Sequence, residues 1–173
     1  MVAHRRGPMD VVEHFAGRYS EARAKFLDAA RDNAADLVEH HPHPGVGPAG
    51  EALATEVARF GPADAPNVLV IGSGTHGIEG FCGSGCQVAL MRDEVVVRPP
   101  PGVAVLLVHA HNPHGFAWGR RVTEGGVDLN RNFVDFGQPL PENPGYRAIH
   151  DWLVPAEWGG GAHKAADAAI EAY

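Results

Sequence analysis

The sequence predicts an α/β protein, and three observations indicate this class. Two short apolar segments, residues 67–71 and 103–109, are bounded by Gly or Pro and are typical of buried strands. Residues 79–92 between them are long enough to form a crossover helix. A strand–helix–strand unit is right-handed and makes its two strands parallel. We therefore expect a mixed, largely parallel sheet with helices on both faces.

The N-terminal part begins with a predicted amphipathic helix. From residue 10 to about residue 37, apolar side chains recur every three or four positions, and Asp10 is suited to cap the helix. Prolines within residues 40–45 end this helix, because proline removes a backbone donor and disfavours helix in the residue before it. A loop or short edge strand follows, and residues 53–60 then alternate weakly, as in a strand.

The C-terminal part is predicted to hold two further helices, at residues 143–153 and 163–173. The second helix reaches the end of the chain with no cap, Gly or Pro, which indicates a truncated C-terminus. Neither an internal repeat nor a low-complexity linker divides the 173 residues. We therefore expect one domain over residues 1–173, and we expect it to be incomplete.

The composition disfavours several classes of protein. Hydrophobic residues make up 45% of the chain and charged residues 20%, as in folded globular proteins. The formal net charge is −7 and no run of Lys and Arg is present, which argues against nucleic acid or an anionic membrane as a partner. No apolar run approaches the roughly 20 residues that cross a bilayer, and no secretory signal is recognisable. We expect a cytoplasmic protein.

A glycine-rich segment after the first predicted strand carries the strongest chemical signal. His76 and Glu79 lie three residues apart on a turn that enters a helix. Both side chains can therefore reach one divalent ion, and zinc accepts imidazole nitrogen and carboxylate oxygen readily. Sites in α/β proteins form in loops at the carboxyl ends of strands. A purely structural alternative is that His76 caps the helix and Glu79 complements its N-terminal dipole.

The same segment also matches the dinucleotide-binding fingerprint. Its glycines have the spacing Gly-x-Gly-x-x-Gly from residue 72, and two acids, Asp93 and Glu94, follow about 20 residues on. In dinucleotide folds, however, the acid lies at the end of the second strand, whereas this pair precedes that strand. The fingerprint would also leave the His and the Glu without a role, so zinc is the preferred interpretation.

The residues after the second predicted strand are suited to hold a carboxylate. Asn112-Pro-His-Gly is followed by Arg120, Arg121 and the run Asp128-Leu-Asn-Arg-Asn-Phe. Guanidinium groups bind both oxygens of a carboxylate, and an amide adds a further donor. Each of these residues alone would be interpreted as a surface charge or a turn, but together they imply an acidic ligand. Two histidines at the end of the strand would line the same site, namely His109 and His111.

In this order, His-x-x-Glu, Asn-Pro-x-Gly and Asp-Leu-Asn-Arg-Asn-Phe resemble the motifs of the zinc carboxypeptidase superfamily. More narrowly, they resemble its bacterial branch known as domain of unknown function 2817, over roughly residues 67–136. The resemblance implies a zinc-carboxypeptidase-like fold in which His76 and Glu79 bind zinc (Zn2+). It also implies that the terminal carboxylate of a substrate binds Asn130 and Arg131. Arg121 would polarise the scissile carbonyl and stabilise its oxyanion, with Arg120 as the alternative.

The sequence departs from the superfamily after Asp-Leu-Asn-Arg. Members supply a third zinc ligand, a His, and a general-base Glu downstream, the Glu near the end of a longer domain. Only His150 and His163 follow in this chain, and neither stands in a context that identifies it as the ligand. No carboxylate resembles the catalytic Glu. We therefore expect the chain to match the N-terminal part of a longer enzyme and to be inactive alone.

The predicted function is that of a zinc-dependent, metallocarboxypeptidase-like hydrolase of peptide or amide bonds. Its partner would be a peptide or acyl-amino-acid substrate with a free carboxylate. Two alternatives stay open. One is an acyl-amino-acid deacylase similar to aspartoacylase, and the other is a non-catalytic remnant that binds metal or carboxylate.

Overall fold

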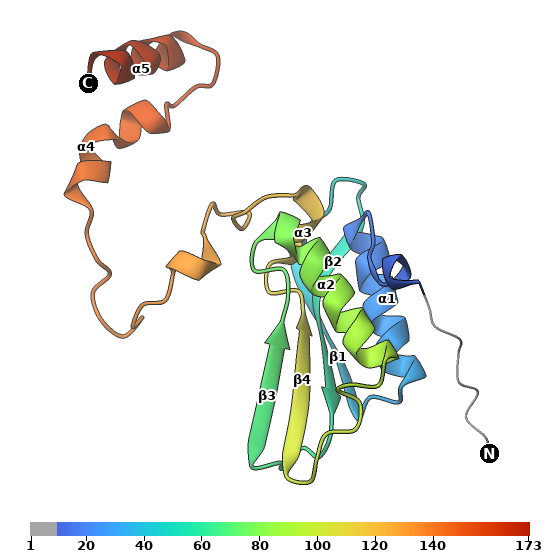
Figure 1. Cartoon of the computed structure of the whole chain (residues 1–173). Coiled ribbons are helices and arrows are strands. Elements are labelled where there is room, and N and C mark those ends of the chain that lie inside the picture. Colours follow the sequence, from blue (N-terminus) through green and yellow to red (C-terminus); the bar gives the residue numbers. More distant parts are fainter. Residues whose placement is uncertain (1–9) are drawn as a thin grey trace. The chain divides into compact units, whose positions relative to one another are not determined.

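The computed structural model of the chain describes residues 10–173, which form two compact units (Figure 1). The first unit ends at Phe133, and the second comprises Val134–Tyr173. In chain order, the first unit contains η1 (Val11–His14), α1 (Tyr19–Asp32), β1 (Leu37–Val46), β2 (Ala52–Phe60), β3 (Asn67–Gly72), α2 (Gly77–Arg92), β4 (Val103–His109), α3 (Pro113–Trp118) and η2 (Leu129–Arg131).

The four strands form one mixed sheet in the order β1-β2-β4-β3. Strands β3 and β4 are parallel and are connected through α2, as the strand–helix–strand pattern predicts. Strand β2 is antiparallel to both β1 and β4. The α/β class and the mixed sheet are thus confirmed, but only one of the three pairings is parallel. The short β1–β2 connection, with Gly50 at φ +79°, permits only an antiparallel pair.

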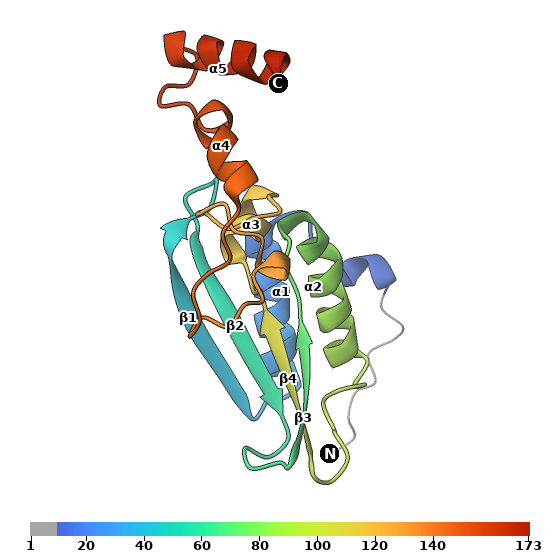
Figure 2. The same ribbon diagram turned by 90° about the vertical axis from the view of Figure 1, so that its left-hand side faces the viewer.

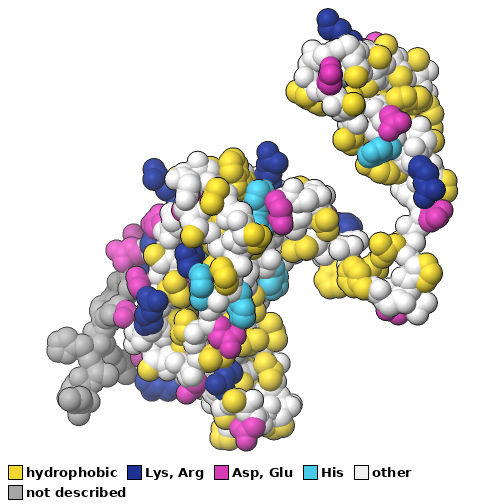
Figure 3. All heavy atoms as spheres, turned by 180° about the vertical axis from the view of Figure 1, so that it is seen from behind, with side chains coloured by type: hydrophobic (Ala, Val, Ile, Leu, Met, Phe, Trp, Pro, Cys, Tyr) yellow, Lys and Arg dark blue, Asp and Glu magenta, His cyan; other side chains and the backbone are white. Residues whose placement is uncertain are grey.

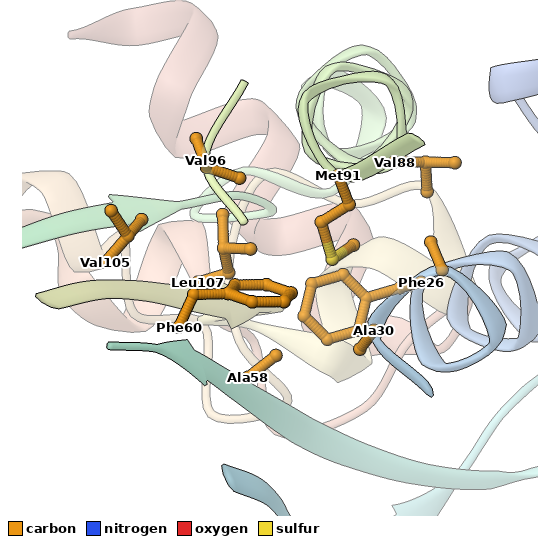
Figure 4. Close-up of a cluster of buried hydrophobic side chains, with 10 residues drawn as sticks. Phe26, Ala30, Ala58, Phe60, Val88, Met91, Val96, Val105 and Leu107 are labelled. Atoms are coloured by element: carbon orange, nitrogen blue, oxygen red, sulfur yellow. The ribbon is translucent and has the colours of Figure 1, made fainter. Parts of the chain in front are cut away.

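Both long helices of the first unit pack on the same face of the sheet. Side chains from α1 and α2 meet side chains from β2 and β4 in one buried cluster, which includes Phe26, Ala30, Ala58, Phe60, Val88, Met91, Val105 and Leu107 (Figure 4). The opposite face of this sheet (Figure 2) carries Val68 and Val70 of β3, which are 56% and 57% exposed. This differs from the predicted helices on both faces.

The N-terminal segment forms two elements where the sequence predicts one helix. The Asp10 side chain accepts a hydrogen bond from the Val12 amide, so it caps η1 as expected. The chain then leaves the helical conformation at Phe15 and re-enters it in α1. The Phe15 ring lies so close to Gly85 of α2 that a Cβ there would overlap it. Packing of this ring against α2 therefore outweighs the local helical pattern.

The second unit contains α4 (Pro144–Leu153) and α5 (Gly161–Ala172), where the sequence predicts helices. The Asn143 side chain accepts a hydrogen bond from the Tyr146 amide and caps α4. A single domain over residues 1–173 stays a prediction. None of the described helices is both long enough and apolar enough to span a bilayer.

Candidate metal and carboxylate site

Two loops meet at the carboxyl ends of the parallel strands β3 and β4. One loop leads from β3 through His76 into α2, and the other leads from β4 into α3. Three backbone hydrogen bonds of 3.0 Å join them: Ser73 N–H to Val108 O, His111 N–H to Ser73 O, and Asn112 N–H to Gly74 O. The loop that carries His76 is therefore held as a continuation of the β3–β4 pairing.

His76 and Glu79 converge at the start of α2. Nδ1 of His76 is 3.2 Å from Oε1 of Glu79. Two atoms that each lie about 2 Å from one zinc ion are separated by no more than about 4 Å, so this pair fits two positions around zinc. The pKa of Glu79 is lowered, first by its backbone hydrogen bond and then by the His76 ring. The His76 side chain makes no capping bond to α2, which disfavours the purely structural alternative.

Asp128 holds the other nitrogen of the His76 ring. Its Oδ1 lies 2.9 Å from Nε2 of His76, and its Oδ2 accepts a 2.9 Å hydrogen bond from Nε of Arg121. These contacts, the His76 bond above all, lower the pKa of Asp128 to about 2. An ionised carboxylate is suited to accept the Nε2–H, so Nδ1, on the side of Glu79, is the nitrogen that a metal ion would bind.

Asp128 has no role predicted from the sequence. Its contact with His76 joins residues 52 positions apart, so spacing along the chain does not reveal it. One signal could have found it. A ligating His commonly donates its second N–H to a carboxylate, and Asp128 directly precedes the Leu-Asn-Arg run at the same sheet edge.

Arg121 joins the cluster through Asp128, whereas Arg120 contributes its backbone. The Arg121 side chain is about half exposed beyond this ion pair. The Arg120 carbonyl accepts the Gly77 amide, and the Arg120 amide donates to the Gly115 carbonyl. The Arg121 side chain thus reaches His76 through Asp128, and its oxyanion role, with Arg120 as the alternative, stays a prediction.

Asn130 and Arg131 lie on η2, directly after Asp128. The Asn130 amide donates to Oδ1 of Asp128 at 3.0 Å, and the Arg131 guanidinium donates to the Asn130 carbonyl. Both residues are exposed. Over residues 10–173, no hydrogen bond links the Arg131 or Asn130 side chain to His76 or Glu79. Their predicted carboxylate-binding role stays a prediction.

A third metal ligand is not identified among residues 10–173. No three His, Cys, Asp or Glu side chains in this range are placed to hold a metal ion. In the second unit, His150 bonds the Tyr146 hydroxyl, and the His163 ring stacks on Trp158. Of the predicted ligands, His76 and Glu79 lie together among residues 10–173, one an imidazole and one a carboxylate.

Several histidine side chains gather on one face of the first unit (Figure 3), so residue type alone does not identify the site. His109 is fully buried against Phe26, and this burial lowers its pKa to about 4. The expectation that His109 lines the site is therefore wrong. His111 is exposed at the loop after β4, where its Nδ1 lies 3.0 Å from the Thr75 hydroxyl.

Comparisons with known proteins identify a family. A family model described as "Protein of unknown function (DUF2817)" matches residues 15–173. This match confirms the resemblance that the motifs indicate. A search of curated proteins finds no match.

Solved structures of zinc exopeptidases and glutaminyl cyclases are distantly similar. A Zn-dependent exopeptidase from Parabacteroides distasonis is 12% identical with a TM-score of 0.42, covering 85% of this chain and 54% of that one. A leucine aminopeptidase precursor from Bacteroides thetaiotaomicron is 12% identical with a TM-score of 0.41, covering 86% and 55%. A glutaminyl cyclase from Porphyromonas gingivalis is 15% identical with a TM-score of 0.42, covering 75% and 54%. The chain spans about half the length of each.

Proposed function

The chain belongs to the DUF2817 family, and we propose that it carries part of the site of a zinc-dependent, metallocarboxypeptidase-like hydrolase of peptide or amide bonds. One observation carries the proposal. The two nitrogens of His76 have separate partners, since Nδ1 faces Glu79 at 3.2 Å and Nε2 faces Asp128 at 2.9 Å. This is the arrangement expected of a metal-ligating histidine with a carboxylate behind it.

His76 and Glu79 would hold the ion, and Asp128 would fix the ring. A bound zinc ion would polarise the substrate carbonyl and lower the pKa of water towards neutrality. The Asp128 carboxylate favours the tautomer of His76 with the proton on Nε2, which keeps Nδ1 free. It also holds the ring plane, because the same carboxylate is anchored by the Arg121 side chain and the Asn130 amide.

The arginines would donate hydrogen bonds to the substrate. Arg121 donates to Asp128 through Nε, and its two terminal nitrogens provide donors for an oxygen that becomes negative in the transition state. Arg131 and Asn130, on η2, would bind the terminal carboxylate of a peptide or an acyl-amino acid. The acyl-amino-acid deacylase alternative uses these same residues.

Zinc binding by the purified chain tests the first half of the proposal. Competition with a chromophoric chelator measures the zinc dissociation constant of the wild type, His76→Ala and Glu79→Ala. His41→Ala is a matched control, because His41 lies on β1 and pairs with Glu39. We expect the two ligand variants to lose zinc and the control to keep it. Equal affinity in all four proteins would exclude zinc at His76 and Glu79.

Turnover tests the second half. Purified chain with added zinc is assayed against a hippuryl-type peptide and an N-acyl amino acid, with Glu79→Ala as the control. We expect little or no hydrolysis, because a catalytic zinc needs three protein ligands and a positioned base. Robust turnover that disappears in Glu79→Ala would contradict this and would indicate that the chain itself supplies the missing groups. Zinc binding without turnover agrees with either an enzyme segment or a non-catalytic remnant.

A further inference from the structure

We infer that His111 is a positioning residue, which holds the loop that carries His76 by binding Thr75. The inference rests on the proposed function and extends it from the two ligands to the residue that fixes their loop. Thr75 directly precedes His76, and its hydroxyl lies 3.0 Å from Nδ1 of His111. This contact therefore links the loop after β4 to the residue next to the ligand.

The His111 ring occupies the space that a side chain at position 72 would fill. A Cβ built on Gly72 would overlap Cε1 and Nε2 of His111. The φ angle of Gly72 is one that any residue adopts, so what opposes a side chain there is the space taken by the His111 ring. The end of β3 is thus shaped to accept the imidazole ring beside it.

The loop between β3 and α2 turns at a glycine before it reaches His76. Gly74 has a φ of +66°, a conformation that glycine adopts without the strain a side chain would add. Backbone hydrogen bonds hold residues 73 and 74, and side-chain hydrogen bonds hold Ser73 and Thr75. Ser73 donates to Gln87 of α2 at 2.9 Å, and Thr75 bonds His111 at 3.0 Å. Loss of the Thr75 bond would remove the side-chain contact nearest to His76.

His111 acts through Thr75 and not as a ligand itself. No group of three potential ligands is placed to hold an ion within the described part of the chain. Partial desolvation lowers the pKa of His111, so a neutral ring can accept a hydrogen bond from the Thr75 hydroxyl. Removal of the Thr75 hydroxyl should therefore reproduce the effect of removing the His111 acceptor.

Zinc affinity in a double-mutant cycle tests this inference. His111→Phe keeps an aromatic ring but removes the hydrogen bond, Thr75→Val removes the hydroxyl at similar volume, and Thr75→Ser restores the hydroxyl. We expect His111→Phe and Thr75→Val each to weaken zinc binding about 3- to 10-fold, less than the roughly 10- to 100-fold typical of a direct partner of a ligand. The double variant should bind as weakly as each single one, since both remove one contact. Thr75→Ser should match the wild type.

Hydrogen exchange of the metal-free protein gives a second readout and separates the two proposals. The Asn112 and Gly77 amides bond the Gly74 and Arg120 carbonyls on either side of Thr75. They should exchange faster in His111→Phe and Thr75→Val than in the wild type, while His41→Phe on β1 leaves them unchanged. Additive losses of zinc affinity, or unchanged exchange in both variants, would overturn the positioning role. If His76→Ala does not alter zinc binding, the proposed zinc function fails, and exchange alone then decides the role of His111.

Discussion

Two histidines at neighbouring strand ends have opposite environments. His76 follows β3 and lies between two carboxylates, which contact its two nitrogens at 3.2 and 2.9 Å. His109 ends β4 and is fully buried among aromatic rings. Its Nε2 lies 2.9 Å from the Ser84 hydroxyl, while its Nδ1 has no hydrogen-bond partner among residues 10–173. Surroundings, and not residue type, decide which imidazole is available to a ligand.

The difference arises from where each residue stands relative to a strand. Side chains alternate between the two faces of β4, and Val105, Leu107 and His109 all point to the face covered by α1 and α2. His109 therefore belongs to the core, because every second side chain of β4 points to the covered face. His76 stands beyond the last residue of β3, outside this alternation, and both nitrogens of its 12% exposed side chain face carboxylates.

Replacing each histidine with alanine should affect different properties, namely zinc affinity at His76 and the free energy of unfolding at His109. His76→Ala should weaken zinc binding more than about 100-fold, because one of two ligands is lost. His109→Ala should leave zinc affinity nearly unchanged but lower the free energy of unfolding by about 2–4 kcal/mol, as other large-to-small core changes do. Chelator competition and urea denaturation of both variants measure these two quantities. A large loss of zinc affinity in His109→Ala, with folding intact, would contradict a purely structural role for that ring.

The buried His109 should make the free energy of unfolding depend on pH. The pKa of His109 is about 4 in the folded protein, below the usual value of 6.5, because burial disfavours the charged ring. As the pH falls below 6.5, the unfolded chain takes up this proton first, so the free energy of unfolding decreases. The contribution of neutral His109 to the free energy of unfolding is complete above pH 6.5 and is lost by about pH 4. The loss amounts to about 3 kcal/mol.

Urea denaturation at pH 7.5, 6.0, 5.0 and 4.5 measures this loss. His109→Phe is the control, because it keeps a ring in the core and removes the titrating group. The variant should show a flatter pH profile than the wild type over this range. Parallel profiles for the two proteins would show that His109 does not resist protonation when the chain is folded.

Much of the fold could be predicted because it depends on local patterns. The two parallel strands, the helix between them and the spacing of His76 and Glu79 all follow from short stretches of sequence. The pairing of His76 with Asp128 could not be predicted in this way, because it depends on how the loop after α3 folds back on the sheet edge. The break in the N-terminal helix could not be predicted from local sequence either, because the contact of Phe15 with α2 causes it.

Removing the charge of Asp128 should have a smaller effect than removing His76. Asp128→Asn keeps the size of the side chain but leaves His76 with a neutral acceptor, so the tautomer with a free Nδ1 is less favoured. We expect zinc binding to weaken about 10- to 100-fold, as for other carboxylates behind a ligating histidine. Chelator competition measures the change, and thermal unfolding shows whether the variant folds. An unchanged dissociation constant would show that His76 is oriented without this carboxylate.

The smallest effect on zinc is expected at Arg131, which carries the predicted carboxylate-binding role. Its guanidinium bonds the Asn130 carbonyl and makes no hydrogen bond to His76 or Glu79 within residues 10–173. Arg131→Ala should therefore change zinc affinity less than about 2-fold, within the usual effect of an exposed substitution. Arg121→Ala is the matched comparison, because it removes a 2.9 Å donor to Asp128 and should weaken zinc more. Equal losses in the two variants would contradict this and would show that the Arg131 side chain also supports the ion, so that metal and carboxylate binding share this residue.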